Sequence, residues 1–530
     1  MYDVIVVGAR CAGSPTAMLL ARKGYRVLLL DRATFPSDAP RCHFIQPPGV
    51  ARLRRWGLLE TIRVSNCPPI PFVRFDVGPF ALVSSPPSLP GDGGSYGPRR
   101  TVLDKILVDA AVRAGVEVRE DFAMEEVLVN GDRVTGVRGH ALNGVTVTEQ
   151  AGIVVGADGM RSLVARAVQA PSYRSKPART CVYFGYWRGV PLEGCEIYVR
   201  EQRVFFAFPT NDDLICIAME WPLQEFQAFR ADLERTFLRT IALAPSLFER
   251  VQAGRREGRF MGSGDLPNFY RKPYGPGWAL VGDAGYHKDP YLAQGISDAF
   301  RDAELVARAI DAGLSGRQEL AEALGDYERQ RNEETTAIYE WNYHLASLDP
   351  PSPEMYRFLG ALRGNQAETN RFFGIMAGTV PVPLEEGSLV VELAQQPCDW
   401  VFPYLGYGLR GWAESRLGKH EEALESMAQS QAFGRQLGER LLLRDWFAAA
   451  YAEVVLAAGR VEDALPLAEV AVELAQSVGS LYSEGLAQRV WGQALAEASP
   501  PRWEEAEAHL ARSVQLLESG EALLEVAAPR

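Results

Sequence analysis

The first 31 residues constrain the fold of this chain more than any other segment. An apolar run over 3–7 ends at Gly8, residues 14–23 have the pattern of a helix, and a second apolar run over 25–30 ends at Asp31. Two apolar runs of strand length joined by a turn and a helix predict a β-turn-α-β unit, which opens a parallel sheet. The sequence therefore predicts an α/β domain of Rossmann type at its N-terminus.

The turn between the first run and the helix reads Gly-Ala-Arg-Cys-Ala-Gly. A dinucleotide fingerprint needs glycine at the tight turn, where the backbone meets the pyrophosphate, and where the helix packs on the strand. Gly8 and Gly13 supply the first and the third, and Arg10 replaces the second. Asp31 is suitably spaced to bind a ribose hydroxyl pair. We expect a nucleotide site here, with the Arg10 side chain directed outward toward the phosphates or ribose; a tight packing turn is the alternative.

Two later motifs specify the nucleotide. Residues 155–162 contain Asp158-Gly159 after a predicted strand, and residues 279–285 contain Gly282-Asp283 after another; a Gln-Gly-Ile-Ser-Asp-Ala segment follows at 294–299. With the fingerprint, this ordered set resembles the p-hydroxybenzoate hydroxylase family, the class A flavoprotein monooxygenases. The resemblance covers about residues 1–345 and implies FAD as cofactor.

The resemblance also implies roles for individual residues. Asp283 would bind a ribityl hydroxyl, and Gly295 and Ile296 would face the isoalloxazine at a helix N-terminus, whose dipole favours negative charge. Arg100 begins an Arg-x-x-Leu-Asp segment and would reach the ribityl-phosphate region, whereas Asp158 belongs to the motif linked to both FAD and NADPH. The expected cofactor-binding residues are Gly8, Gly13, Asp31, Arg41, Arg100, Asp158, Gly159, Gly282, Asp283, Gly295 and Ile296.

Simpler interpretations exist for three of these residues. Asp158 and Asp283 could be helix caps, and Arg100 could be a surface charge. The catalytic residue is unknown from the sequence. His43 and His287 lie near motifs, but a packing or capping role suits each at least as well. Aromatic residues are dense in the expected β-layer, where they could line a substrate pocket or form plain core: Tyr183, Phe184, Tyr186, Trp187, Tyr198, Phe205, Phe206, Phe208 and Trp221.

The order of predicted elements indicates an α/β FAD-binding domain interleaved with a β-sheet substrate domain, followed by an all-α helical repeat domain. From about 172 to 270 successive strands predict an antiparallel layer, with a helix near 225–242. The expected FAD-binding parts are about 1–67, 99–170 and 271–345; the β-layer covers about 68–98 and 171–270, closing helices 346–385, and repeats 386–530. A Val-Pro-Val-Pro stretch at 380–383 predicts an extended linker.

The C-terminal sequence is rich in Ala, Leu and Glu and repeats itself. Similar helix, turn and acidic-start patterns appear at 416–424 and 457–465, with a looser copy at 501–508. The copies recur at a period of roughly 41–42 residues, which is typical of a helical-hairpin solenoid. The tail resembles tetratricopeptide repeats, with an ordinary Ala-rich bundle as the alternative, and its concave surface could bind a protein partner.

Composition excludes several classes of function. The formal net charge is -12, which argues against nucleic-acid binding. No apolar run is long enough to span a membrane, no secretory signal is visible, and the 7 cysteines contain no Cys-x-x-Cys pair. We therefore expect a cytoplasmic protein with no metal site and no disulfide-reductase chemistry.

Three functions remain open at this point. The first is an FAD-dependent monooxygenase that uses NAD(P)H as a transient reductant, O2, and an organic small molecule of apolar or aromatic character; a single dinucleotide fingerprint suits permanent FAD and brief NAD(P)H contact. The second is a geranylgeranyl-reductase-like flavoprotein. The third is a flavin-bearing sensor or scaffold that acts through its repeats. The Trp-x-Trp-x-Ile-Pro segment of flavin-dependent halogenases is absent.

Overall fold

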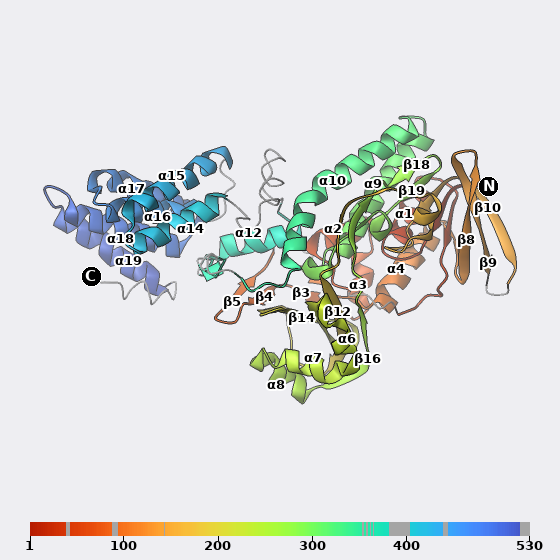
Figure 1. Ribbon diagram of the computed structural model, residues 1–530, viewed down its shortest axis with the longest axis horizontal. Helices are drawn as coiled ribbons and strands as arrows, with labels where there is room; N and C mark the ends of the chain where they lie inside the picture. Colours follow the sequence, from red (N-terminus) through yellow and green to blue (C-terminus); the bar gives the residue numbers. More distant parts are fainter. Residues whose placement is uncertain are drawn as a thin grey trace. The chain divides into compact units, whose positions relative to one another are not determined.

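The computed structural model describes residues 1–38, 43–86, 94–141, 144–351, 355–356, 359–360, 362–363, 365–380, 403–437 and 444–519. The chain forms two compact units. The first comprises Met1–Pro79, Ser85–Asp349 and Met376–Thr379, and the second comprises Phe80–Ser84, Pro350–Ile375 and Val380–Arg530. Figure 1 shows the elements of each unit.

The predicted β-turn-α-β unit opens the first unit: β1 (Tyr2–Val7), α1 (Gly13–Ala21) and β2 (Val27–Leu30). These strands belong to a sheet with the order β18-β19-β10-β1-β2-β7, in which β1 lies parallel to both β2 and β10. Strands covered on both faces need continuous apolar runs, which the sequence of β1 and β2 supplies. The other strands are β7 (Glu117–Arg119), β10 (Thr146–Gly156), β18 (Tyr274–Gly275) and β19 (Trp278–Leu280).

The two faces of this sheet are covered differently. Val4, Val6 and Leu29 pack into a core with helices, whereas Ile5 and Leu28 pack against the hairpin of β8 (Phe122–Asn130) and β9 (Arg133–Ala141). Side chains alternate between faces along a strand, so neighbouring residues join different cores. The helices on the first face are α1, α2 (Pro47–Trp56), α3 (Leu59–Val64), α4 (Arg100–Arg113), α9 (Gly295–Leu314) and α10 (Leu320–Leu345).

The predicted β-layer is a second sheet, whose strands run β16-β12-β15-β14-β13-β4. Helices cover one of its faces (Figure 1). The helix expected near 225–242 is divided at Asp232, whose backbone (φ −146°, ψ 61°) leaves the helical region. The strands are β4 (Val73–Asp76), β12 (Thr180–Arg188), β13 (Cys195–Arg200), β14 (Arg203–Pro209), β15 (Leu214–Pro222) and β16 (Arg255–Ser263), and the helices are α6 (Phe226–Ala231), α7 (Leu233–Ile241) and α8 (Pro245–Ala253).

The aromatic residues of this layer divide between its two faces. One set packs with α6–α8 in a closed core: Tyr183, Trp187, Tyr198, Phe205 and Trp221. The other set belongs to a cluster on the opposite face, with Phe44 and Ala293 from the cofactor-binding parts: Phe184, Tyr186, Phe206 and Phe208. Both sets therefore take part in packing, and a substrate pocket lined by the second set stays a prediction.

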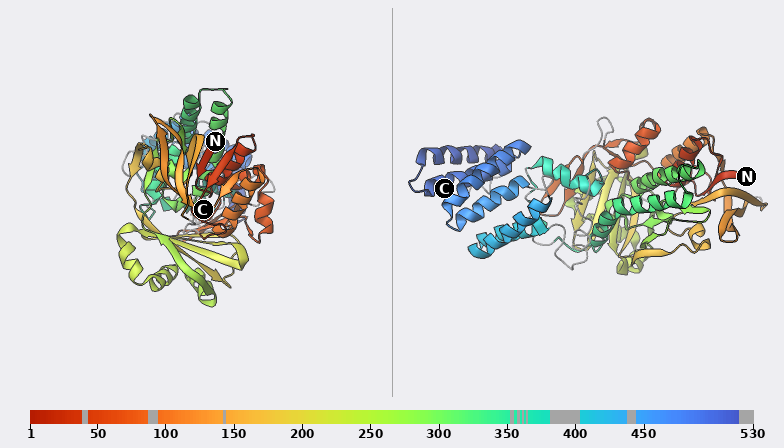
Figure 2. Two further views of the ribbon diagram at one scale, coloured as in Figure 1. Left: turned by 90° about the vertical axis from the view of Figure 1, so that its right-hand side faces the viewer. Right: turned by 90° about the horizontal axis from the view of Figure 1, so that it is seen from above.

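The second unit is helical, as expected. Its helices pack as consecutive pairs, which Figure 2 shows in blue. Gly418 and Gly459 close two of the turns with φ of +75° and +76°, a conformation that favours glycine. The helices are α12 (Gln366–Ala377), α14 (Pro403–Arg416), α15 (His420–Leu437), α16 (Arg444–Ala457), α17 (Val461–Val478), α18 (Leu481–Glu497) and α19 (Trp503–Ser519).

The boundary between the units differs in detail from the sequence pattern. The expected division near 385 and most of the Val-Pro-Val-Pro stretch lie in 381–402, outside the described residues. The structure groups Pro350–Ile375 with the second unit, whereas the sequence pattern places them among the closing helices of the first. Across the described ranges, no helix has the length and apolar character to cross a membrane.

Candidate functional site

The expected motifs meet because the strands that precede them end in register. Val7 of β1 pairs with Leu30 of β2 and with Gly156 of β10, and Gly156 pairs with Leu280 of β19. These strands are parallel, so the segments that follow them leave the same edge of the sheet. Ligands bind at that edge in open α/β folds.

The fingerprint turn has no room for side chains at its two glycines. Gly8 has φ +104°, and a Cβ there would lie 2.5 Å from the carbonyl oxygen of Ala157. A Cβ on Gly13 would lie 1.7 Å from the carbonyl oxygen of Gly8. The turn therefore needs glycine for close packing against the start of the Asp158 motif, as the sequence predicted for the first and third fingerprint positions.

Asp31 organises the fingerprint turn. Its Oδ2 accepts a hydrogen bond from the Ala9 amide at 2.7 Å, and its Oδ1 accepts one from the Ala33 amide at 2.8 Å. The side chain is only half-buried. The carboxylate thus sits at the nucleotide edge with lone pairs remaining, because a carboxylate can accept about four hydrogen bonds.

The Arg10 side chain contacts two polar residues and one aromatic ring. Its Nη1 lies 2.5 Å from Oδ2 of Asp104, and its Nη2 donates to Oγ of Ser37 at 3.0 Å. The guanidinium also lies over the ring of Phe35. These contacts hold the Arg10 guanidinium within the protein, and its nearness to a phosphate or ribose stays a prediction.

Arg100 shares the same acid. Its Nη2 lies 2.8 Å from Oδ1 of Asp104, and both side chains are buried. Burial lowers the pKa of this guanidinium, but the acidic side chains around it, which include Asp104 and Asp283, raise the pKa above its ordinary value. The start of α4 therefore approaches the Gly282-Asp283 motif, and Arg100 is not the surface charge that the alternative required.

Asp158 has both a capping role and a free acceptor. Its Oδ2 accepts from the amides of Leu163 (2.6 Å) and Val164 (3.2 Å), which lie at the start of α5 (Leu163–Ala167). Its Oδ1 is inaccessible to solvent and has no hydrogen-bond partner among the described residues. Burial raises the pKa of Asp158, although these hydrogen bonds oppose the shift. An acceptor in this state suits a ligand hydroxyl or amine.

The first position of α9, Gly295, has free space beside it and follows the loop that ends at Gln294. A Cβ added to Gly295 would meet nothing within 4 Å, and Gln294, which precedes it, makes no side-chain cap. Ala293 adopts a left-handed conformation (φ 51°), which turns the chain into the helix. The first amides of α9, including that of Ile296, thus have no side-chain cap from Gln294, and their contact with an electron-rich group stays a prediction.

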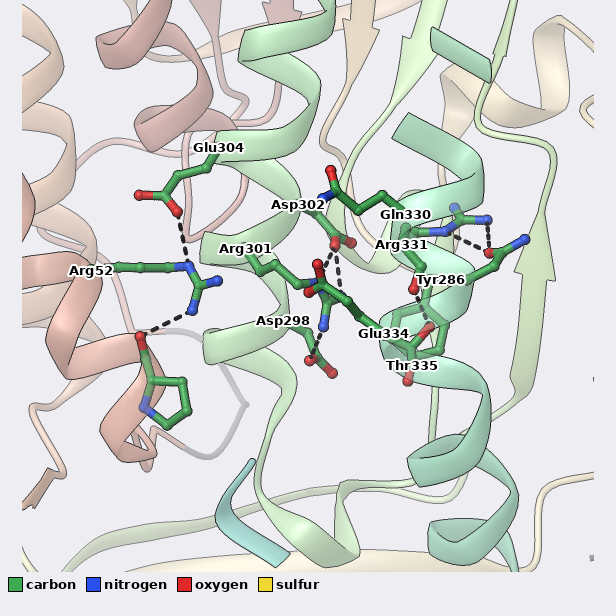
Figure 3. A network of polar contacts seen from close by, with 12 residues as sticks. Arg52, Tyr286, Asp298, Arg301, Asp302, Glu304, Gln330, Arg331, Glu334 and Thr335 are labelled. Atoms are coloured by element: carbon green, nitrogen blue, oxygen red, sulfur yellow. Dashed lines mark hydrogen bonds and ion pairs between the residues drawn. The ribbon is translucent and has the colours of Figure 1, made fainter. Parts of the chain in front are cut away.

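A buried charge network fixes α9 on its neighbours (Figure 3). Arg301 donates to Asp298 at 2.8 Å and to Asp302 at 2.7 Å, and Lys288 pairs with Asp298. On another side of the helix, Arg52 of α2 donates to Glu304 at 3.1 Å. Sequence reasoning missed these residues; the close spacing of charges along α9 was their only signal. Their effect is to hold the helix whose first turn forms the site.

The candidate histidines have structural partners. His43 is fully buried between the carbonyl oxygen of Gly97 and the hydroxyl of Tyr186, each 2.9 Å from a ring nitrogen. Burial and the nearby arginines lower the pKa of His43 to about 3, so the ring is neutral at ordinary pH. His287 places Nδ1 against the carbonyl oxygen of Pro267. Arg41 lies outside the described residues.

The residues at this edge fit a dinucleotide cofactor. Gly8 and Gly13 allow a tight turn, Asp31 and Asp158 offer acceptors for hydroxyl groups, and the start of α9, which Gln294 does not cap, offers amide donors. Dinucleotide phosphates and ribityl hydroxyls require this combination of donors and acceptors.

Comparison with known proteins identifies the cofactor. The FAD binding domain family model matches residues 1–342. A tryptophan 2-halogenase of Chondromyces crocatus is 24% identical over 62% of this chain and 64% of its own length. A digeranylgeranylglycerophospholipid reductase of Methanocella arvoryzae is 25% identical (66% and 87%), and a kynurenine 3-monooxygenase of Salinispora tropica is 29% identical (63% and 77%).

The fold agrees with this family. The structure of a myxobacterial chondrochloren halogenase, described as FAD-dependent, superposes with a TM-score of 0.61 at 25% identity. The superposition covers 71% of this chain and 92% of the halogenase chain. The family match over residues 1–342 includes the motifs at the sheet edge and most of the first unit. The chain belongs to the FAD binding domain family and is an FAD-dependent enzyme.

Proposed function

We propose that the chain is an NAD(P)H-dependent monooxygenase that hydroxylates or epoxidises an organic small molecule. The observation that carries the proposal is the packing of the loop before Gly295 against the aromatic face of the second sheet. Ala293 belongs to the cluster on that face, and the Tyr291 ring meets Phe206 edge-on at 6.4 Å. A substrate held on this face would therefore lie beside the start of α9.

The side chains suit an apolar or aromatic substrate. Phe184, Phe206 and Phe208 present rings on this face, and aromatic rings stack well on planar substrates. Bound FAD would supply the oxygen-transfer chemistry, with NAD(P)H as the reductant and O2 as the oxidant. The protein then has to bind, orient and shield the substrate, and the aromatic face with the loop before Gly295 would support this.

The expected cofactor residues divide the binding task. We assign Asp31 and Asp158 to hydroxyl groups of the cofactor, Asp283 to the ribityl chain, and Arg100 to the region between ribityl and phosphate. Gly8, Gly13, Gly159 and Gly282 allow the backbone to approach. Gly295 and Ile296 offer amides to the ring system. These roles rest on the shared sheet edge and on the family's motifs.

A reductase is the second candidate. Its support is the similarity to digeranylgeranylglycerophospholipid reductases, which equals that to the halogenase within one percentage point. An apolar sheet face would also suit an isoprenoid chain. A halogenase has less support, because the Trp-x-Trp-x-Ile-Pro segment is absent from the sequence.

We also propose that the helical hairpins of the second unit are tetratricopeptide-like repeats that bind a protein partner, and that the enzyme is cytoplasmic. Stacked hairpins present an extended surface, which is the usual basis of partner binding by solenoids. A sensor or scaffold role would follow if partner binding changed flavin reduction without any substrate turnover.

Substrate-dependent NAD(P)H oxidation tests the function. The purified full chain would be mixed with NADH or NADPH and a panel of phenols, aromatic amines and isoprenoid lipids, with and without oxygen. A monooxygenase consumes NAD(P)H and O2 together only when its substrate is present. Oxidation of NAD(P)H that proceeds without oxygen and yields a saturated isoprenoid would support the reductase instead.

A further inference from the structure

A cavity of about 390 Å³ lies beside the aromatic face of the second sheet. Its apolar wall is formed by Tyr186, Leu214 and Met261, which belong to the cluster against which Ala293 packs. Pockets for small organic molecules usually measure about 300–1,000 Å³, so the cavity has a suitable size. Its polar wall carries three arginines and three acids: Asp38, Arg99, Arg188, Asp212, Glu257 and Arg259.

A bulge in β16 brings Arg259 to this cavity. The strand pairs on either side of Gly185 in β12 leave this glycine opposite three residues of β16, 258–260. Gly258 has φ +71°, a conformation that favours glycine. Bulges interrupt the regular alternation of side chains, redirect single residues and are frequent beside active sites. The position of Arg259 therefore depends on a local departure from strand geometry.

The residue after Arg259 anchors the bulge on the opposite face of the sheet. The Phe260 ring lies 4.6 Å from the Phe237 ring, in the core shared with α6–α8. A Cβ on Gly185 would lie 3.0 Å from the Phe260 ring, so the glycine leaves the space that this ring needs. Arg259 itself is exposed and forms no hydrogen bond or ion pair with any residue that the structure describes. The bulge thus presents an unpaired guanidinium to the cavity.

Arg99 supplies a second guanidinium from the start of α4. Its amide donates to Oδ1 of Asn211 at 2.8 Å, and its guanidinium lies 4.8 Å from the centre of the Tyr186 ring. Its Nε is inaccessible to solvent and has no hydrogen-bond partner among the described residues. Its Nη2 lies 3.6 Å from Oδ2 of Asp38, which is beyond hydrogen-bond distance. The guanidinium is therefore held in place while donors remain that the described residues do not use.

The other charges of the cavity are paired or exposed. Arg188 places Nε 3.4 Å from Oε1 of Glu257, and its Nη1 donates to the carbonyl oxygen of Asp212 at 2.9 Å. Glu257 is also paired with Arg255, and both arginines lower its pKa. The Asp212 residue is exposed to solvent. The two guanidinium groups described above are therefore the cations that remain for a ligand.

The Tyr186 hydroxyl already donates its hydrogen to His43. The carbonyl oxygen of Gly97 can only accept, so Nδ1 of His43 carries a hydrogen. Because the lowered pKa keeps the ring neutral, Nε2 is an acceptor, and the Tyr186 hydroxyl 2.9 Å away must donate to it. An anion beside the Tyr186 ring would therefore receive its hydrogen bonds from the arginines.

We propose that this cavity binds the substrate through a carboxylate, with Arg99 and Arg259 as the residues that hold it. The apolar wall receives the rest of the molecule, so the substrate is an organic acid with an apolar or aromatic body. A guanidinium suits this role because its planar fork can form two parallel hydrogen bonds with a carboxylate. The inference rests on the proposed function for the reaction that follows binding.

Binding of 2-naphthoate to the FAD-loaded full chain tests this site without turnover. The neutral amide, 2-naphthamide, has nearly the same shape, and quenching of naphthyl fluorescence gives both dissociation constants. We expect wild type to bind the acid about tenfold or more tightly than the amide. Arg259→Met and Arg99→Met should each weaken binding of the acid about tenfold to a hundredfold, because a charged hydrogen bond is lost. Binding of the amide should not change.

Arg239→Met is the matched control. Arg239 is an exposed residue of α7, on the helix-covered side of the sheet, and its substitution removes the same charge. This variant should bind the acid and the amide as wild type does. Arg259 is exposed like Arg239, so Arg259→Met keeps the test decisive even if Arg99→Met fails to fold.

Three results would overturn the proposal. Wild type could bind the acid no more tightly than the amide, or the affinity for the acid could survive both substitutions. The variants could also raise the dissociation constant of NADPH alone, which would assign the cavity to the reductant. Incorporation of oxygen from O2 into a product decides the monooxygenase function separately, so failure of that function is distinguishable from failure of the carboxylate site.

Discussion

Arg10 and Asp104, which come from two separate cofactor motifs, form an ion pair with 2.5 Å between Nη1 and Oδ2. Asp104 has no exposed surface and also binds Arg100. This buried carboxylate pairs with two guanidinium groups, and it holds the fingerprint turn against the start of α4. Arg10, which replaces the second fingerprint glycine, therefore helps to hold the two motifs together.

Arg10→Gly should retain FAD but lose stability. The substitution restores the common motif, and Arg100 still neutralises Asp104. Because one charged hydrogen bond to a buried acid disappears, we expect a loss of about 1.5–3 kcal/mol in the free energy of unfolding, with FAD affinity within about tenfold of wild type. Urea unfolding and FAD titration of the apoprotein measure the two effects. Arg10→Met separates loss of the donors from the gain of a glycine; loss of most FAD in both variants would show that the guanidinium anchors the cofactor.

Gly8→Ala should abolish FAD binding. The residue has φ +104°, and the new Cβ would lie 2.5 Å from the Ala157 carbonyl oxygen, so the turn and the Asp158 motif must separate. Gly24→Ala is the matched control, since Gly24 has φ +93° but nothing within 4 Å of its Cβ position. The control should lose stability through backbone strain alone and keep its flavin, which absorbance at the flavin bands would report. Equal flavin content in the two variants would contradict this account of the turn.

Asp283→Ala should weaken FAD binding about tenfold to a hundredfold. Loss of a hydrogen bond to a charged group costs on the order of 1.5–3 kcal/mol, which corresponds to that range of affinity. Flavin fluorescence during rebinding to apoprotein gives the dissociation constant. Asp265→Ala is a suitable control, because Asp265 pairs with Arg161 on an exposed surface. An unchanged dissociation constant in Asp283→Ala would remove the ribityl role from this residue.

Because His43 is buried, we expect the first unit to lose unfolding free energy as the pH falls. Its pKa in the folded protein is lowered to about 3 from 6.5. Between these values the unfolded chain binds a proton that the folded protein does not, so stability falls as the pH decreases from 6.5 toward 3. From pH 6.5 to 5 this amounts to about 2 kcal/mol. His43→Gln should flatten this part of the curve of unfolding free energy against pH; an equal slope in the variant would show that other groups cause it.

Substitution of Asn365 should lower the stability of the second unit and leave FAD binding unchanged. Its Nδ2 donates to Oδ2 of Asp445 and to Oγ of Ser480, both at 3.1 Å, and all three residues are buried. Asn365→Leu leaves the buried Asp445 without this donor and should cost about 1–3 kcal/mol in the unfolding of the helical unit. Far-ultraviolet circular dichroism follows that transition. Gln366→Leu, at an exposed neighbouring position, is the control, and a loss of FAD in Asn365→Leu alone would show that the units are coupled.

Most of the fold could be predicted from short sequence patterns. The strands and turn around Gly8, the acid at Asp31 and the start of α9 were predictable because each depends on residues close in sequence. The division of the long helix at Asp232 and the grouping of Pro350–Ile375 with the repeats were not, since both depend on tertiary packing.

Oxygen-18 labelling of the product tests the central claim most directly. The full chain, reduced by NAD(P)H, would be given its substrate under 18O2 in ordinary water, and separately under ordinary O2 in H218O. The monooxygenase account predicts one 18O atom in each product molecule from 18O2 and none from labelled water. A product that carries no atom from 18O2, formed while NAD(P)H is consumed, would contradict the account and assign the enzyme to reduction.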